Sequence, residues 1–170
     1  MVAAAEVSIT NLTRRNITYT LDEAYDSIKK FNIIAGTLKA PTLETLDLYN
    51  SLSFEECCES VEAFETQDAP NVLKEAIDEF YVICGKLQVL EAMGMNVAEG
   101  LRMVCENNLQ KFTPAGKPLS YDNNHTVTFN EEFQMFVLKN ADGKVVKPCT
   151  YKKVDLKGLV PNNFFQKGNE

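Results

Sequence analysis

The chain has 170 residues, 45% of them hydrophobic, and a formal net charge of −7. This size fits one domain with a short appendage, and the negative charge excludes binding of nucleic acid polymers or anionic membranes through bulk electrostatics. His125 is the only histidine and no glycine-rich phosphate loop occurs, which argues against a His-based zinc site, a Ser-His-Asp triad and a P-loop, so any catalysis is expected to depend on carboxylates.

The chain up to Phe112 is predicted to be helical after an irregular arm over residues 1–19. Thr20-Leu21-Asp22-Glu23 matches a capping box, and we expect the first helix to run from there to about Ala35, where Gly36 ends it. Three more helices are expected, over about residues 43–66 with a candidate break near 51–53, over about 71–93, and over about 97–112.

The pattern changes from helical to extended after Pro114. Thr126–Phe129 and Phe136–Leu138 are predicted to be short strands, and the turn at Asn140–Gly143 could close a hairpin onto Lys144–Val146. The predicted fold is therefore all-α: a four- to five-helix bundle completed by oligomerisation, with residues 20–113 as the helical domain and residues 114–170 as a small extended or hairpin appendage packing on it.

The sequence also predicts the compartment. No apolar run is long enough to span a bilayer, and Met1–Glu6 lack the basic and apolar regions of a signal peptide. The five cysteines are odd in number, and the adjacent Cys57 and Cys58 are poorly placed to pair. Because this pattern is typical of a reducing environment, we expect a cytoplasmic protein without a membrane partner.

Two of the predicted helices carry acidic pairs with helical-turn spacing. Glu56 and Glu59 lie on the second helix, and Glu75 and Asp78 lie on the third. Residues three apart project from one helix face, so two such helices packed side by side would direct four carboxylates into one space, the kind of site that Mg²⁺ prefers. Each pair taken alone is more often a solvated surface, and Glu56 could instead cap a helix with Ser53.

Helical-wheel positions, at about 100° per residue, separate these acids from an apolar stripe on each helix. The stripes comprise Leu46, Phe54, Cys57, Val61 and Phe64 on the second helix and Leu73, Ile77, Phe80, Cys84 and Leu87 on the third. The acids share their faces with other apolar residues, among them Ala63, Val82 and Val89. Both helices are therefore expected to be buried on two sides, by another helix or another subunit, and acids at such an edge favour a neutralising cation.

Three sequence blocks then occur in a recognisable order. They are Glu55-Glu56-Cys57-Cys58-Glu59 followed by Lys74-Glu75-Ala76-Ile77-Asp78, Val104 to Phe112 with the pattern N-x-x-K-F, and Asp142-Gly143-Lys144-Val145-Val146-Lys147-Pro148 with Tyr151. Together they resemble the MazG-like all-α nucleoside triphosphate pyrophosphohydrolases, a superfamily that includes phosphoribosyl-ATP pyrophosphohydrolases and dimeric dUTPases. The blocks are similar to those of phage and bacterial members. Residues 119–138 look like an insertion between the second and third blocks.

This resemblance implies hydrolysis of a nucleoside triphosphate between its α and β phosphates, for cleansing or balance of the nucleotide pool. It implies that Glu56, Glu59, Glu75 and Asp78 hold Mg²⁺, with Mn²⁺ as an alternative, and Glu59 is our candidate for activating the attacking water. The implied substrate-binding residues are Asn108 and Lys111, then Lys144, Lys147, Tyr151 and Asn32.

Each of these residues also has an ordinary structural explanation. Lys111 could compensate the end of the fourth helix, Tyr151 could pack in the core, and Asn32 could be a helix-end amide. The resemblance further implies a homodimer or homotetramer, located in the host cytoplasm if a phage encodes it. Two alternatives stay open: a non-catalytic helical interaction protein that retains the fold, and a helical phosphohydrolase acting on another class of nucleotide.

Overall fold

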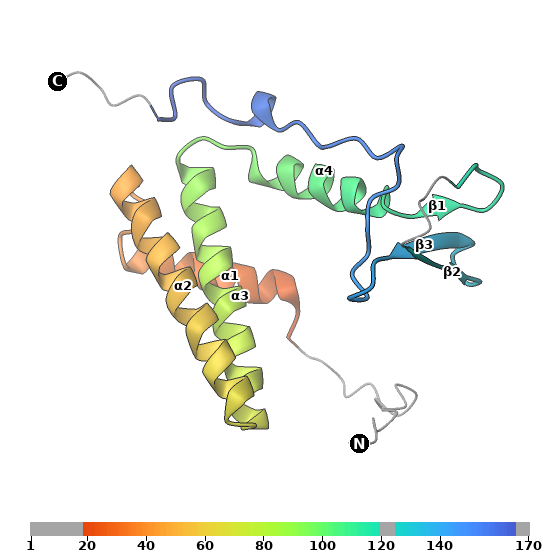
Figure 1. The fold of residues 1–170 in the computed structure, drawn as a ribbon. Helices are drawn as coiled ribbons and strands as arrows, with labels where there is room; N and C mark the ends of the chain where they lie inside the picture. The colour runs from red at the N-terminus through yellow and green to blue at the C-terminus, as the bar shows by residue number, and fades with distance from the viewer. Residues whose placement is uncertain (1–18, 120–124, 166–170) are drawn as a thin grey trace. The chain divides into compact units, whose positions relative to one another are not determined.

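The computed structural model describes residues 19–119 and 125–165, which form two compact units divided between Ala92 and Met93 (Figure 1). Apart from Tyr19, the predicted N-terminal arm lies outside these residues. The first unit contains helices α1 (Leu21–Ile34), α2 (Leu43–Glu65) and α3 (Ala69–Ala92). The second contains helix α4 (Val97–Leu109), strands β1 (Thr113–Pro114), β2 (Thr126–Asn130) and β3 (Met135–Lys139), and a 3₁₀ turn, η2 (Lys157–Leu159).

Capping boxes fix the starts of the first two helices. The Thr20 hydroxyl accepts a hydrogen bond from the backbone N–H of Glu23 at 3.2 Å, and the Glu23 carboxylate accepts one from the N–H of Thr20 at 2.7 Å. Thr42 and Thr45 make the same reciprocal pair at the start of α2. Each box satisfies backbone donors that have no partner within the helix, which confirms the predicted starts.

The predicted break in the second helix does not occur. The Ser51 and Ser53 hydroxyls donate to the carbonyl oxygens of Asp47 and Tyr49, one turn earlier, so these serines are accommodated inside a continuous α2. Because Ser53 lies inside the helix, the alternative explanation of Glu56 as part of a helix-capping box is wrong.

Helices α2 and α3 run side by side as a hairpin (Figure 1). The surface between them carries the acids. Ala63, Val82 and Val89 are buried, and Glu75 is buried with them at 3% exposure. We call this surface the acid face and define it by Glu56, Glu75 and Asp78. The sequence placed these residues away from the main apolar stripe, yet the acid face is where the two helices meet.

The predicted core stripes are for the most part not core in a single chain. Phe54 and Phe64 are 73% and 74% exposed, and Leu73 is 65% exposed. Cys57 is exposed as well, whereas Cys84 is buried. We call the uncovered part the exposed stripe: Phe54, Val61 and Phe64 on α2, and Leu73, Ile77 and Phe80 on α3. A helical wheel shows which face is apolar but not which element covers that face, and burial of these residues by another subunit stays a prediction.

A buried polar network joins the three helices of the first unit. The Tyr49 hydroxyl of α2 donates to Asn32 Oδ1 of α1 at 2.7 Å, and Asn32 Nδ2 donates to Gln88 Oε1 of α3 at 3.0 Å. Gln88 Nε2 in turn donates to the carbonyl oxygen of Tyr25 at 3.0 Å. Asn32 and Gln88 are each 1% exposed, so these bonds replace the water that both amides lose on folding.

The second unit corrects the predicted all-α class: the protein is mostly helical but includes a small sheet. The three antiparallel strands lie in the order β1-β3-β2, with Val127 opposite Leu138, and Leu138 is buried. The strands and the turn at Asn140–Gly143 lie where the sequence predicted them. Thr113–Pro114 adds a strand that was not predicted, because two residues are too short to show an alternating pattern.

Candidate active site

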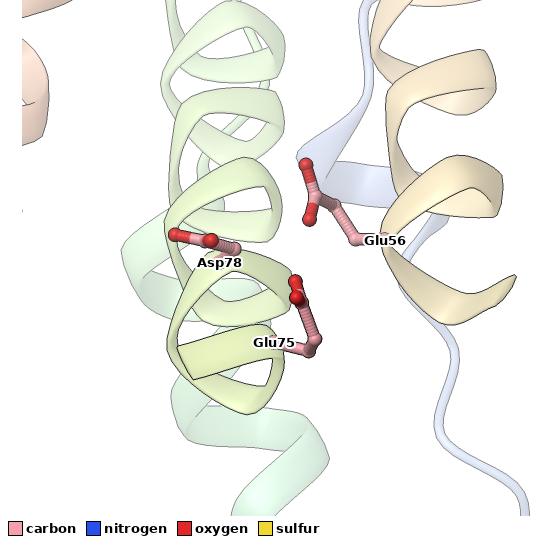
Figure 2. Close-up of side chains that lie close together, drawn as sticks. All are labelled: Glu56, Glu75 and Asp78. Atoms are coloured by element: carbon pink, nitrogen blue, oxygen red, sulfur yellow. The ribbon is translucent and has the colours of Figure 1, made fainter. Parts of the chain in front are cut away.

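Three of the four predicted acids converge between α2 and α3. One oxygen each from Glu56, Glu75 and Asp78 lies within 4.8 Å of the others, and Figure 2 shows the Glu56 side chain reaching from α2 toward the two acids of α3. Glu75 is buried, whereas Glu56 and Asp78 are half-buried. The arrangement follows from the local sequence, since residues three apart on α3 share a face and the hairpin brings that face against α2.

Lys74 supplies a cation to this cluster, a role that the sequence analysis did not assign. Its ammonium donates to both carboxylate oxygens of Glu75, at 3.0 and 2.9 Å, and lies 3.0 Å from Asp78 Oδ2. The spacing of Lys74 and Asp78, four residues apart on one helix, was a usable signal for the second contact. The contact with Glu75 joins adjacent residues, which no helical-spacing rule predicts.

The electrostatics of the cluster show an excess of negative charge. Burial raises the pKa of the Glu56 carboxyl above its ordinary value. The nearby charges of Asp78, Glu59 and Glu75 raise it further, and Lys74 opposes them. Conversely, hydrogen bonds to Glu75 and Asp78 raise the pKa of the Lys74 ammonium. The cluster therefore binds positive charge more favourably than an isolated carboxylate does.

The chemistry of the donor set fits a hard divalent cation. Carboxylate oxygens are the ligands that Mg²⁺ takes, and the Lys74 ammonium already stands as a cation beside two of the three groups. Adjacent oxygens around an octahedral Mg²⁺ lie about 3 Å apart. The three carboxylate oxygens lie within 4.8 Å of one another, so they would move closer together or bind through bridging waters to hold one ion, and further waters and substrate would fill the remaining positions.

Glu59, the fourth predicted acid, lies beside the cluster. Its carboxylate is not among the three that converge, and the residue is exposed. It lines an open cleft of about 280 Å³ together with Glu75 of the cluster. Sequence reasoning did not single out the other residues that line this cleft: Glu62, Thr66 and Asn71. An exposed carboxylate next to a cluster of this kind is suitably placed to accept a proton from water, and its role stays a prediction.

Asn32 is not part of the acid cluster. Both ends of its amide are occupied by the buried network with Tyr49 and Gln88. The structure thus gives Asn32 a role in packing three helices, and its predicted contact with a base stays a prediction from the resemblance.

Asn108 and Lys111 lie at the end of α4 in the second unit. Asn108 is exposed, and its Nδ2 donates to the carbonyl oxygen of Val104 at 3.0 Å. Lys111 is half-buried in the turn after the helix, where its N–H donates to the Asn108 carbonyl oxygen at 3.1 Å. The predicted fourth helix extended to Phe112 and is in fact shorter, because this turn replaces its last residues. The contacts of both residues with substrate stay predictions.

The remaining substrate candidates belong to the C-terminal segment. The Tyr151 hydroxyl donates to Asn107 Oδ1, and Asn107 Nδ2 donates to the Lys152 carbonyl oxygen at 2.6 Å. Lys147 lies over the Tyr151 ring, with its ammonium 4.9 Å from the ring centroid. Lys144 is exposed in the turn that follows Asn140. Asn107 is the residue that ties this segment to α4, and sequence reasoning missed it in favour of its neighbour Asn108.

Comparison with known proteins adds no relative to this description. No family model, no curated protein and no solved structure matches the chain. Among the described residues, no helix combines the length and apolar character needed to cross a membrane.

Proposed function

We propose that this chain is a Mg²⁺-dependent hydrolase that cleaves ribo- or deoxyribonucleoside triphosphates between the α and β phosphates. The observation that carries the proposal is the convergence of Glu56, Glu75 and Asp78 across the α2–α3 hairpin, with their oxygens within 4.8 Å. Three carboxylates repel a polyphosphate unless a divalent cation lies between them. A site of this kind is therefore suited to a metal–nucleotide complex rather than to a free anion.

In the proposed reaction the residues divide into two roles. Glu56, Glu75 and Asp78 would hold Mg²⁺, which when bound supplies positive charge to the phosphates. Glu59 would accept a proton from a water whose oxygen bonds to one of the two phosphorus atoms that flank the α–β bridge. The bridging P–O bond breaks, giving nucleoside monophosphate and pyrophosphate. By the resemblance, Asn108 and Lys111 would contact the phosphates or sugar, with Lys144, Lys147 and Tyr151 as further substrate contacts.

A product assay tests this proposal. The protein is incubated with a panel of ribo- and deoxyribonucleoside triphosphates and Mg²⁺, and the products are resolved by anion-exchange chromatography. Nucleoside monophosphate with pyrophosphate is the expected pair. Diphosphate with orthophosphate would show that the wrong bond was assigned, and no turnover of any nucleotide would favour a non-catalytic interaction protein.

We also propose that the chain functions as a homodimer or a dimer of dimers. The support is the exposed stripe, because large apolar side chains in regular rows on two neighbouring helices are unusual on a monomer surface. A second copy of the hairpin presents the same rows and would cover them in a symmetric contact. Sedimentation equilibrium measures the outcome directly, and a stable monomer at micromolar concentration would contradict the proposal.

A further inference from the structure

Lys74 stands in a position that a divalent cation would also use. Its ammonium lies within 3.0 Å of both Glu75 oxygens and of Asp78 Oδ2, which are two of the three converging carboxylates. Each Glu75 oxygen therefore already accepts a hydrogen bond from one positive group. A divalent ion at the same oxygens would lie close to the ammonium, and two cations at such a distance repel each other.

The two partners differ in their freedom to move. The Glu75 side chain is 4% exposed and fixed within the hairpin, whereas the Lys74 side chain is 58% exposed. A lysine stem at the surface can change rotamer without disturbing the packing, and it regains conformational entropy when its ammonium is released. The carboxylates can thus remain in place while the ammonium leaves.

We propose that Lys74 is a built-in counter-ion, which holds Glu75 and Asp78 in place without metal and competes with the divalent ion for them. This inference rests on the proposed function, since it concerns the same site. Lys74 is a positioning residue in this scheme, because it acts on the ligands and not on the substrate. Its competition sets how much metal the site requires.

Metal binding measures the competition without any substrate. Mn²⁺ binding to the full chain is followed by electron paramagnetic resonance of the free ion, for the wild type and for Lys74→Met. The variant should bind Mn²⁺ roughly two- to fivefold more tightly, the range expected when one partly exposed ion pair is removed. Without metal the melting temperature of the variant should be lower than that of the wild type, because Glu75 remains buried without a counter-ion. Saturating Mn²⁺ should raise the melting temperature of the variant by more than it raises that of the wild type.

Lys86→Met is the matched control. It removes the same charge from the same helix about 18 Å away, at 1.5 Å per residue, so it reports the effect of net charge alone. If Lys74→Met does not fold without metal, Lys74→Arg provides the second test. A guanidinium retains the charge and can bind carboxylate oxygens in pairs, so it should weaken Mn²⁺ binding.

The pattern of results separates this inference from the proposed function. Tighter binding by Lys74→Met but not by Lys86→Met supports it, as does weaker binding by Lys74→Arg. Equal or weaker binding by Lys74→Met while the wild type still binds Mn²⁺ overturns the counter-ion role and leaves the metal site intact. If neither the wild type nor Lys74→Met binds Mn²⁺, both ideas fail, and binding by Lys74→Met alone would support the counter-ion role while removing metal from the wild-type function.

Discussion

The two faces of the α2–α3 hairpin show the reverse of the burial that their composition suggests. The acid face, with Glu56, Glu75 and Asp78, lies between the helices, and Glu75 is among the most buried polar residues of the described chain. The exposed stripe has the more hydrophobic side chains, yet Val61 and Ile77 are each 54% exposed. Within one chain the polar face is covered and the apolar face is open.

This contrast agrees with the two proposals made above, a cation site on the acid face and a subunit contact on the exposed stripe. Burying carboxylates costs free energy, so a chain that places them between its helices while leaving large apolar residues outside does not maximise the stability of a lone subunit. The arrangement is consistent with carboxylates retained for binding a cation and with an apolar surface retained for another subunit.

The largest effect is expected on the acid face from Glu75→Gln. The substitution keeps the shape of the side chain but removes the charge that is central to the cluster, so turnover of the preferred nucleotide should fall by roughly 100- to 1,000-fold, as for loss of one strong charge-stabilising group. Glu79→Gln, four residues further along α3, is the matched control and should retain activity. Unchanged turnover in Glu75→Gln, with circular dichroism showing a folded protein, would remove the carboxylate argument.

A substitution on the exposed stripe should weaken self-association rather than turnover. Val61→Glu places a charge on a surface that the proposed dimer buries, and the dissociation constant should rise by roughly 100-fold or more. The helices of the isolated subunit should remain folded, because Val61 is already exposed in a single chain. Sedimentation velocity across a concentration series measures the shift. Leu101→Glu in α4, at a residue that is 57% exposed, is the control; loss of self-association in both variants, or in neither, would argue against the stripe as the interface.

The hairpin faces also show where sequence reasoning succeeded. The starts of α1 and α2 were predictable because a capping box involves residues only three positions apart, such as Thr20 and Glu23. The convergence of Glu56 with Glu75 and Asp78 was predictable from turn spacing plus the assumption that consecutive helices pack together. These features depend on local geometry, which can be inferred from the spacing of residues along the chain.

The features that were missed depend on contacts across the chain. Asn32 bonds Gln88 from 56 positions away, and Asn107 bonds Lys152 from 45 positions away, so no spacing rule relates them. Which helix face is covered depends likewise on the neighbour. Lys74 is the intermediate case, since half of its role was visible as a pair with Asp78 at four-residue spacing.

The packing of α2 on α3 at the acid face should depend on the close approach of the two helices at Gly85. A methyl group built on Gly85 would lie 2.6 Å from a ring carbon of Tyr49, which is itself held by its bond to Asn32. We therefore expect Gly85→Ala to lower the free energy of unfolding by about 1–3 kcal/mol through overpacking, measured by urea denaturation. Gly158→Ala, where no atom lies within 4 Å of the added carbon, is the control and should change stability little. Equal stability of both variants would mean that the hairpin can open at this contact without cost.

The smallest expected effect is on pH dependence and concerns the charge of the acid face alone. Because the pKa of Glu56 is raised in the folded chain, the folded state binds this proton more tightly than the unfolded state, and stability falls as the pH rises from the ordinary pKa of about 4.3 through the raised value. In the absence of metal, Glu56→Gln should therefore be more stable than the wild type at neutral pH. After allowance for solvent screening the gain is a few tenths of a kcal/mol, and it should vanish at about pH 4 and below.

Urea denaturation with a chelator present, at neutral pH and at about pH 4, measures the difference, with the adjacent exposed Glu55→Gln as control. If excess Mg²⁺ reverses the stability that Glu56→Gln gains at neutral pH, the Glu56 carboxylate is stabilised by the cation that it is proposed to hold. If Mg²⁺ leaves this gain unchanged, the Glu56 carboxylate does not hold the cation.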